Sequence, residues 1–447
     1  MDDESLLSRG RKIPPPTSDN NSGPEKVDVV IIGSGPAGLA VCGALSRLQS
    51  VKYLALESQD SSTPAWRKHY RRLHLHTHRD DSYLPYLPFP SHYPIWVSRQ
   101  QLLNYFDAYR LLYAPTQVRV EHTVESVSWT ADKGYELQVN TPDGRKTFVG
   151  KNVVVACGEN SVPNIPVFPG QESFQGPILH TSQYLDGEPF RGKRVLLVGY
   201  GNSNGEIALD LWERDAIPMI LQRSPMCIIK RDSILAERNK TPFLPKLLSM
   251  LGQKFVKKLA RVLDVVLSKH LVDTKKYGIP PLKDGYGPCT RLVATARPMQ
   301  IDVGTLELIE KKEITLIYGV VKELTKKGAI LLNKNTGQEE EHEFDAIVLG
   351  TGHLPSATFT KFLSPDIYNK VVGQNGFPRI KGSETEQKGL FFVGYDDIMG
   401  RLHMIHDEAI EVAKQIGRAA KTHSKSKKAK IQTSSALEQG GSKYNAT

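Results

Sequence analysis

The stretch VDVVIIGSGPAG, residues 27–38, decides how the chain begins to fold. Its first six residues are mostly apolar and β-branched, which predicts a strand buried in a parallel sheet. The glycine turn leads into AGLAVCGALSRL, residues 37–48, a stretch typical of a helix. VKYLALES, residues 51–58, predicts the next strand. The chain therefore begins with a βαβ unit.

The turn has the glycine spacing of a dinucleotide-binding fingerprint, at Gly33, Gly35 and Gly38. The first glycine of such a turn permits a tight bend, the second lets the backbone approach a pyrophosphate, and the third lets helix and strand pack closely. The helix opens at Pro36 and Ala37, where free N–H groups and the helix dipole favour phosphate. We expect these five residues to bind a dinucleotide.

A second strand–glycine–helix unit, KRVLLVGYGNSNGEIALDL, occupies residues 193–211, with its turn 166 residues after the first. The third glycine position falls on Asn204, and Gly205 comes one residue later. This unit is an internal repeat and predicts a second nucleotide-binding site. Its candidate binding residues are Gly199, Gly201, Asn202 and Ser203.

The two units differ in charge at the ends of their second strands. Glu57 lies 24 residues after Gly33, and Arg223 lies 24 residues after Gly199. A carboxylate accepts hydrogen bonds from ribose hydroxyls and repels a 2′-phosphate, whereas an arginine pairs with that phosphate. The first site thus suits FAD or NAD, and the second suits NADPH. The alternative for Arg223 is an ordinary surface arginine.

These patterns predict an α/β chain with two Rossmann-like dinucleotide-binding domains. We expect a discontinuous FAD-binding domain (26–170 and 331–420) with an NADPH-binding domain (171–330) inserted in it. Residues 1–25 and 421–447 are expected to be disordered tails, since the first is rich in Pro and Ser and the second carries six Lys and one Glu.

Composition excludes several classes of protein. Hydrophobic residues make up 39% of the chain, which suits a globular protein, and no apolar run reaches the ~20 residues of a membrane span. Four scattered cysteines without a CxxC favour a reducing, cytoplasmic setting and exclude dithiol chemistry. Much of the net charge of +10 lies in the C-terminal tail, and no nucleic-acid-binding motif accompanies it.

Two further features have modest interpretations. Residues 245–271 predict a basic amphipathic helix, for which packing on the body is favoured over contact with a membrane surface. His74, His76 and His78 alternate along the chain, but no neighbouring Cys or acid completes a metal-binding set, so we expect no metal.

A third motif lies between the two units: FxGxxxHxxxY, at Phe174, Gly176, His180 and Tyr184. With both fingerprints and the strand end LGTG (residues 349–352), it makes the chain resemble the class B flavin-dependent monooxygenases over roughly residues 27–420. The stretches LHLHT and YLPYLPFPSHYPIW resemble most the plant-type YUCCA branch, the indole-3-pyruvate monooxygenases.

The resemblance implies FAD and NADPH as cofactors and O2 as co-substrate. In this family, reduced flavin forms a C4a-(hydro)peroxide that oxygenates a small organic substrate: a soft nitrogen or sulfur nucleophile, or, in the plant-type branch, a 2-oxo acid that loses CO2. It also suggests His76 as a catalytic residue beside the flavin, because animal-type members have Asn there.

Two alternatives stay open at this point. One is an FAD- and NAD(P)H-dependent reductase that passes electrons to a separate acceptor. The other is a family member that binds FAD without turnover, because Asn204 departs from the family's glycine in the NADPH turn.

Overall fold

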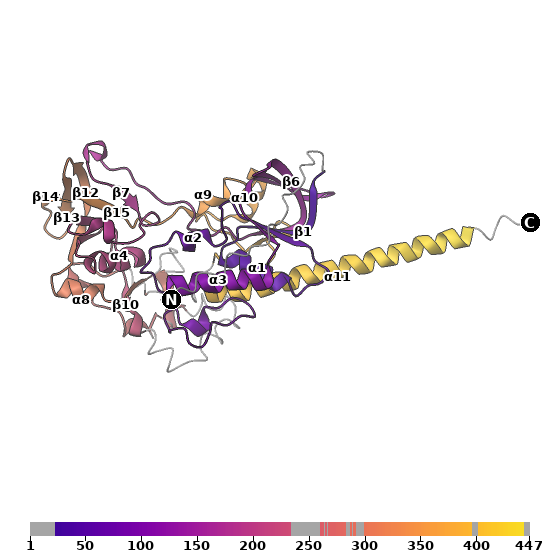
Figure 1. The fold of residues 1–447 in the computed structure, drawn as a ribbon, viewed down its shortest axis with the longest axis horizontal. Helices are drawn as coiled ribbons and strands as arrows, with labels where there is room; N and C mark the ends of the chain where they lie inside the picture. Colours follow the sequence, from indigo (N-terminus) through magenta and orange to yellow (C-terminus); the bar gives the residue numbers. More distant parts are fainter. Residues whose placement is uncertain are drawn as a thin grey trace, which may run out of the picture.

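The computed structural model describes residues 23–233, 260–262, 264–265, 267–282, 287, 289–291, 299–395 and 401–441. These residues form two α/β lobes, with the long helix α11 running from the first lobe out to the C-terminal side (Figure 1). The predicted fold class is confirmed. The predicted basic helix falls mostly outside the described residues, as does the tail at residues 1–22.

The first lobe holds both ends of the described chain. Its elements are β1 (Glu25–Ile32), α1 (Pro36–Leu45), β2 (Tyr53–Leu56), α2 (Pro64–Arg67), η1 (Arg79–Asp81), α3 (Arg99–Tyr113), β3 (Val118–Arg119), β4 (Thr123–Thr130), β5 (Gly134–Thr141), β6 (Gly144–Val155), α9 (Pro355–Phe359), α10 (Pro365–Val371), β16 (Leu390–Phe392) and α11 (Arg401–Gly441).

The sheet of the first lobe runs β3-β2-β1-β6-β5-β4. Strands β1 and β2 pair in parallel, as the βαβ pattern predicts, and β1 also pairs in parallel with β6. The long strand β6 continues as an antiparallel meander with β5 and β4, while its C-terminal half pairs with β16. The return of the chain at β16 makes this lobe discontinuous.

The second lobe is built between the two segments of the first. Its elements are η2 (Gln171–Ser173), β7 (Ile178–His180), η3 (Glu188–Phe190), β8 (Arg194–Val198), α4 (Asn202–Trp212), β9 (Ile217–Gln222), β10 (Ile228–Lys230), η4 (Thr274–Tyr277), β11 (Gln300–Asp302), α8 (Thr305–Glu310), β12 (Thr315–Thr325), β13 (Gly328–Asn333), β14 (Glu339–Glu343) and β15 (Ala346–Leu349).

The second sheet, in the order β14-β13-β12-β9-β8-β15-β7, corrects one predicted boundary. Sequence reasoning returns the chain to the first domain at residue 331, but β13, β14 and β15 all belong to the second sheet. Strand β15 lies between β8 and β7, in parallel with both. The chain therefore returns to the first lobe after Leu349. The sequence did not reveal this boundary, because strand pairing over such distances leaves no local mark in it.

Two crossing segments join the lobes side by side. The Asn164 amide donates to the carbonyl of Gly352 (2.9 Å), and the Leu354 amide donates to that of Val162 (2.8 Å). Since both crossings leave buried parallel strands, β6 and β15, they place the carboxyl ends of the two sheets toward a common boundary.

Helices α3 and α11 both pack on α1. Ser98 caps α3 in a capping box with Gln101, and both are residue types that favour such a cap. Helix α11 extends through Gly441, where the sequence predicts a disordered tail from residue 421. No proline follows Pro378, so nothing rigid interrupts that helix. None of the helices, so far as the described residues were searched, is long and apolar enough to cross a membrane.

The inner part of α11 packs on α1 through buried side chains, among them Ile405, Val412 and Ile416. We predict that Ile416→Ala lowers the free energy of unfolding by about 2–5 kcal/mol, because it leaves a cavity between these helices. Lys421→Ala, at an exposed position of the same helix, should change it by less than about 0.5 kcal/mol. Denaturant titration of the holoprotein measures both, and equal effects would contradict this packing.

Candidate functional site

In the first glycine turn, two of the three glycines leave no room for a side chain, and the third faces open space. Gly33 has φ +100°, and a Cβ there would lie 2.8 Å from the Ala156 carbonyl oxygen. A Cβ on Gly38 would lie 2.0 Å from the Gly33 oxygen. A Cβ on Gly35, the N-cap of α1, would meet nothing within 4 Å. This open position lies at the amino end of α1, where the first backbone N–H groups are free to bind a pyrophosphate.

Glu57 lies beside this turn, directly after β2, and is 5% exposed. One carboxylate oxygen accepts from the Ser34 amide (2.9 Å) and hydroxyl (3.1 Å), and the other accepts from the Gln59 amide (3.1 Å). The Ser58 hydroxyl is a longer, fourth donor, to that second oxygen (3.4 Å), and as a hydroxyl it can rotate away to make room for a ribose hydroxyl. A separate hollow of ≈ 280 Å³ lies at the edge of the sheet, lined partly by Asp60, Val118 and Val120.

The second turn repeats this geometry. Gly199 has φ +92°, and its Cβ would lie 2.7 Å from the Gly350 oxygen. Gly201 caps α4 with φ −94° and ψ −179°, close to the φ −65° and ψ −176° of Gly35. A Cβ on Gly201 also meets nothing within 4 Å. Both turns are thus shaped for the same kind of ligand.

The departure at Asn204 has a steric counterpart on the neighbouring strand. The Asn204 side-chain amide donates to the carbonyls of Gly199 (2.7 Å) and Val198 (3.2 Å). A Cβ on Gly350 would lie 2.3 Å from that amide. In the first unit the residue that follows the adjacent strand, at the position of Gly350, is Ala156, whose carbonyl oxygen lies beside Gly33. The second unit therefore has Asn204 in place of the helix glycine and Gly350 in place of the alanine after the strand. The space that the glycine turn needs is kept.

The end of β9 carries more positive charge than the sequence pattern indicated. Arg223 is exposed and follows β9 directly. The Lys334 ammonium donates to the Arg223 carbonyl (2.9 Å) and lies over the ring of Tyr318, 5.4 Å from its centroid. Sequence reasoning missed Lys334, which β13 brings to the site from 111 residues away. Two cations here suit a 2′-phosphate.

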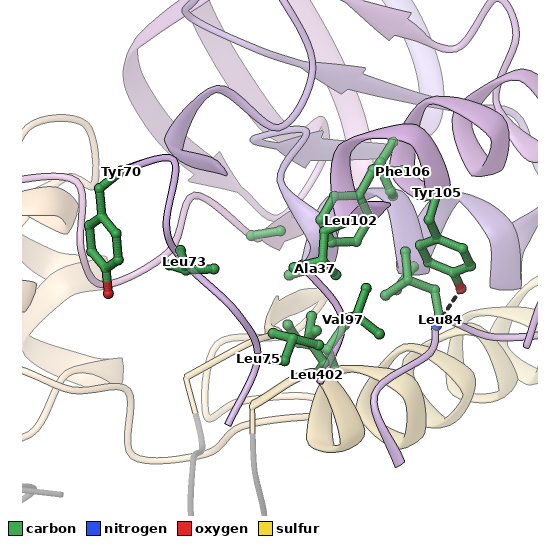
Figure 2. Close-up of a cluster of buried hydrophobic side chains, with 14 of the residues drawn as sticks. Ala37, Tyr70, Leu73, Leu75, Leu84, Val97, Leu102, Tyr105, Phe106 and Leu402 are labelled. Atoms are coloured by element: carbon green, nitrogen blue, oxygen red, sulfur yellow. Dashed lines mark hydrogen bonds between the residues drawn. The ribbon is translucent and has the colours of Figure 1, made fainter. Parts of the chain in front are cut away.

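Segment 64–96 leaves the first sheet and lies against both lobes. Its apolar side chains pack near the start of α1 and α11, with Leu75 close to Ala37 and Leu402 in Figure 2. The Tyr105 hydroxyl accepts from the Leu84 amide (2.7 Å) and fixes the segment on α3. These side chains belong to one buried apolar cluster that reaches the first turn at Ala37.

His76 lies on this segment and reaches the second lobe. Its Nε2 lies 2.7 Å from a carboxylate oxygen of Glu206, on α4. The Tyr70 hydroxyl donates to the same oxygen (3.2 Å). Glu206 is 3% exposed and Tyr70 2%. Sequence reasoning selected His76 but missed Glu206, because nothing in the sequence joins residues 130 positions apart.

His180 and His353 lie at the crossing between the lobes. His180 lies 3.0 Å through Nε2 from the Gly352 carbonyl oxygen, at the crossing between the lobes, and Tyr184 donates to Asp210 (2.7 Å). Burial lowers the pKa of His353, beside His180, to about 4, so its ring is neutral at physiological pH. Among the residues described, no group of three or more His, Cys, Asp or Glu could hold a metal ion.

Comparison with known proteins agrees with this geometry. A family model described as flavin-binding monooxygenase-like matches residues 57–395. The chain belongs to this family. Accordingly, it is a flavin-dependent monooxygenase with FAD and NADPH as cofactors.

Individual relatives cover most of the chain. The indole-3-pyruvate monooxygenase YUCCA1 of Oryza sativa subsp. japonica is 33% identical over 392 residues, 87% of this chain and 90% of that protein. YUCCA4 of the same organism is 29% identical over 382 residues, 82% of each chain.

Solved structures share the fold at lower identity. A flavin-containing monooxygenase from Stenotrophomonas maltophilia matches with a TM-score of 0.61 at 21% identity, covering 89% of this chain and 99% of that one. The closed cyclohexanone monooxygenase matches with a TM-score of 0.64 at 16% identity, covering 89% and 85%.

We predict that Gly350→Ala disrupts the second turn, because the added methyl overlaps Asn204. It should weaken NADP⁺ binding by about tenfold or more, as measured by calorimetry on the holoenzyme. The double variant Asn204→Gly with Gly350→Ala copies the first unit and should recover most of the affinity. If the double variant binds no better than Gly350→Ala alone, the steric exchange is wrong.

Proposed function

We propose that this monooxygenase acts on a small 2-oxo acid with an aromatic side chain, of the indole-3-pyruvate class. The substrate would lose its carboxyl group as CO2 and become the carboxylic acid one carbon shorter. One O2 and one NADPH are consumed with a proton, and NADP⁺ and one water are formed. The relatives named indole-3-pyruvate monooxygenase support this choice of substrate.

The cofactor assignment rests on one observation. The two glycine turns have similar backbone geometry, but the strand that follows the first leads into Glu57 and the strand that follows the second leads into Arg223. Gly33, Gly35, Pro36, Ala37 and Gly38 would hold the FAD pyrophosphate. Glu57 would accept hydrogen bonds from its ribose.

The second turn would hold NADPH in the same way. Gly199, Gly201, Asn202 and Ser203 would face its pyrophosphate, and Arg223 would bind the 2′-phosphate. Lys334 lies beside Arg223 and would add a second positive charge to that site.

Flavin, when bound and reduced, supplies the activation of O2. The chain's own part is to orient the cofactors and to keep water out. Leu75, Ala37 and Leu402 form an apolar wall near the first turn, which favours a dry reaction site. His76 lies between the lobes and would hold or accept a proton on the substrate side.

We predict that Arg223→Ala raises KM for NADPH by about 10–100-fold, since a charge-assisted hydrogen bond contributes about 1.5–3 kcal/mol. KM for NADH should change by less than about twofold. Steady-state kinetics with both coenzymes measures the difference. Arg191→Ala, an exposed arginine before β8, is the matched control and should change neither constant. Equal effects of Arg223→Ala on both coenzymes would contradict the assignment.

Turnover of indole-3-pyruvate under ¹⁸O2 tests the substrate class. We expect one ¹⁸O atom in the product acid and one CO2 per NADPH consumed. A panel of amines and sulfides, run in parallel, should give little product. If oxygenated amines or sulfides form and the acid does not, the proposed substrate class is wrong. Release of all the oxygen as hydrogen peroxide, with every substrate, would contradict the proposed function.

A further inference from the structure

Glu206 receives two hydrogen bonds from the other lobe. It lies in the second turn of α4, the helix that begins at Gly201, and its Oε1 accepts from both His76 and Tyr70. Both donors belong to segment 64–96 of the first lobe. The His76 side chain is 15% exposed and that of Glu206 is 4% exposed. The contact is therefore partly closed to water and lies between the two proposed cofactor turns.

The chemistry of the pair sets the state of the imidazole. An ionised carboxylate only accepts hydrogen bonds, so the proton of a neutral His76 ring lies on Nε2. Nδ1 then carries the lone pair. In the described part of the chain, Nδ1 has no hydrogen-bond partner, so this nitrogen is left to accept a proton.

The other titratable groups that face Glu206 keep their charge state near pH 7. Five titratable or charged groups act on Glu206: His76, His69, Tyr70, Arg72 and Arg231. Burial lowers the pKa of His69 to about 4 and raises that of Tyr70 well above its usual value, so both are neutral near pH 7.

The two arginines are engaged by other groups. Arg72 forms a bidentate pair with Glu213 (2.9 and 2.7 Å). The Arg231 guanidinium lies over the ring of Trp96, 4.7 Å from its centroid. Both guanidinium groups stay positive near pH 7.

We propose that Glu206 is a positioning residue that holds His76 with Nδ1 free as a proton acceptor at the boundary between the lobes. The inference rests on the proposed function, which places the substrate there. Neutral His76 takes one proton from the O–H of the group that attacks the substrate's carbonyl carbon, and the imidazolium stays paired with Glu206. The same proton is then given to the oxygen atom that leaves as water, so the pair ends each turnover as it began.

The pair also makes this acceptor depend on docking of the two lobes. Glu206 is carried by the helix of the NADPH turn, and His76 by the segment that lines the first turn. If the lobes move apart, the imidazole loses the carboxylate that fixes its tautomer. A proton acceptor of this kind is assembled only when both cofactor sites face each other.

Glu206→Gln tests the role of the charge, because an amide oxygen still accepts from His76 and Tyr70. In wild type, the acid limb of the kcat/KM profile should follow the protonation of His76. Glu206→Gln removes the negative charge that faces the imidazolium, so the midpoint of that limb should move to lower pH. Glu206→Asp, which keeps the charge, should stay closer to the wild-type midpoint. A Glu206→Gln profile identical to that of wild type would overturn the proposal.

Three controls separate positioning from simple docking. His76→Gln keeps a donor to Glu206 and should remove the acid limb, and adding Glu206→Gln to it should cause no further shift. Glu213→Gln removes a carboxylate from the same helix at the exposed pair with Arg72 and should leave the midpoint unchanged. If Glu213→Gln shifts the midpoint as much as Glu206→Gln, the effect is one of docking and the proposal fails.

A measurement without turnover keeps this test independent of the substrate. In the oxidised holoenzyme labelled with ¹⁵N-histidine, the His76 signals are those absent from His76→Gln. We expect a protonated Nε2 and an unprotonated Nδ1, with a titration midpoint that falls in Glu206→Gln. The opposite tautomer, or an unchanged midpoint, would overturn the inference. Failure of wild type to oxygenate any substrate would count against the proposed function alone.

Discussion

Each lobe depends on the close approach of a helix start to the end of its own strand. In the first lobe, Gly38 leaves no room for a side chain against Gly33. The strand crossing behind it ends at Ala156, whose carbonyl oxygen closes the space around Gly33. This packing aims the amino end of α1 away from the sheet and toward a ligand. Gly35 lies between these two closely packed glycines and is the position of the turn that faces open space.

The contacts between the lobes differ in how far they are buried, and therefore in how much each contributes to stability. Glu206, Asp210 and Glu213 follow one another along α4 at helical spacing. Glu213 meets Arg72 at the surface, where an ion pair contributes about 0–1 kcal/mol. Glu206 meets His76 and Tyr70 in a site that is mostly closed to water, where a hydrogen bond to a charged group contributes about 1.5–3 kcal/mol. The buried contact therefore determines how segment 64–96 lies on α4.

The sequence could predict what is encoded locally. Both βαβ units and the cap of α3 at Ser98 follow from short patterns, and the structure has them at the expected residues. It could not predict contacts between distant residues. Strands β13 to β15 pair with strands far away in the chain, so the boundary at residue 331 was wrong. The extension of α11 past residue 421 was missed because charge suggested disorder, whereas the absence of proline allows a helix.

Asn204 shows why a fingerprint has to be judged together with the strand beside it. Taken alone, the third position of the second turn suggests a weakened coenzyme site. Yet the glycine there serves only to leave space, and space can be provided from either side of the contact. Here Gly350 provides it, 146 residues further along the chain, and the Asn204 amide adds hydrogen bonds to Gly199 and Val198. With that exchange in place, Gly201 keeps an extended backbone similar to that of Gly35. A missing glycine in such a turn therefore argues against coenzyme binding only when the facing strand offers no compensating space.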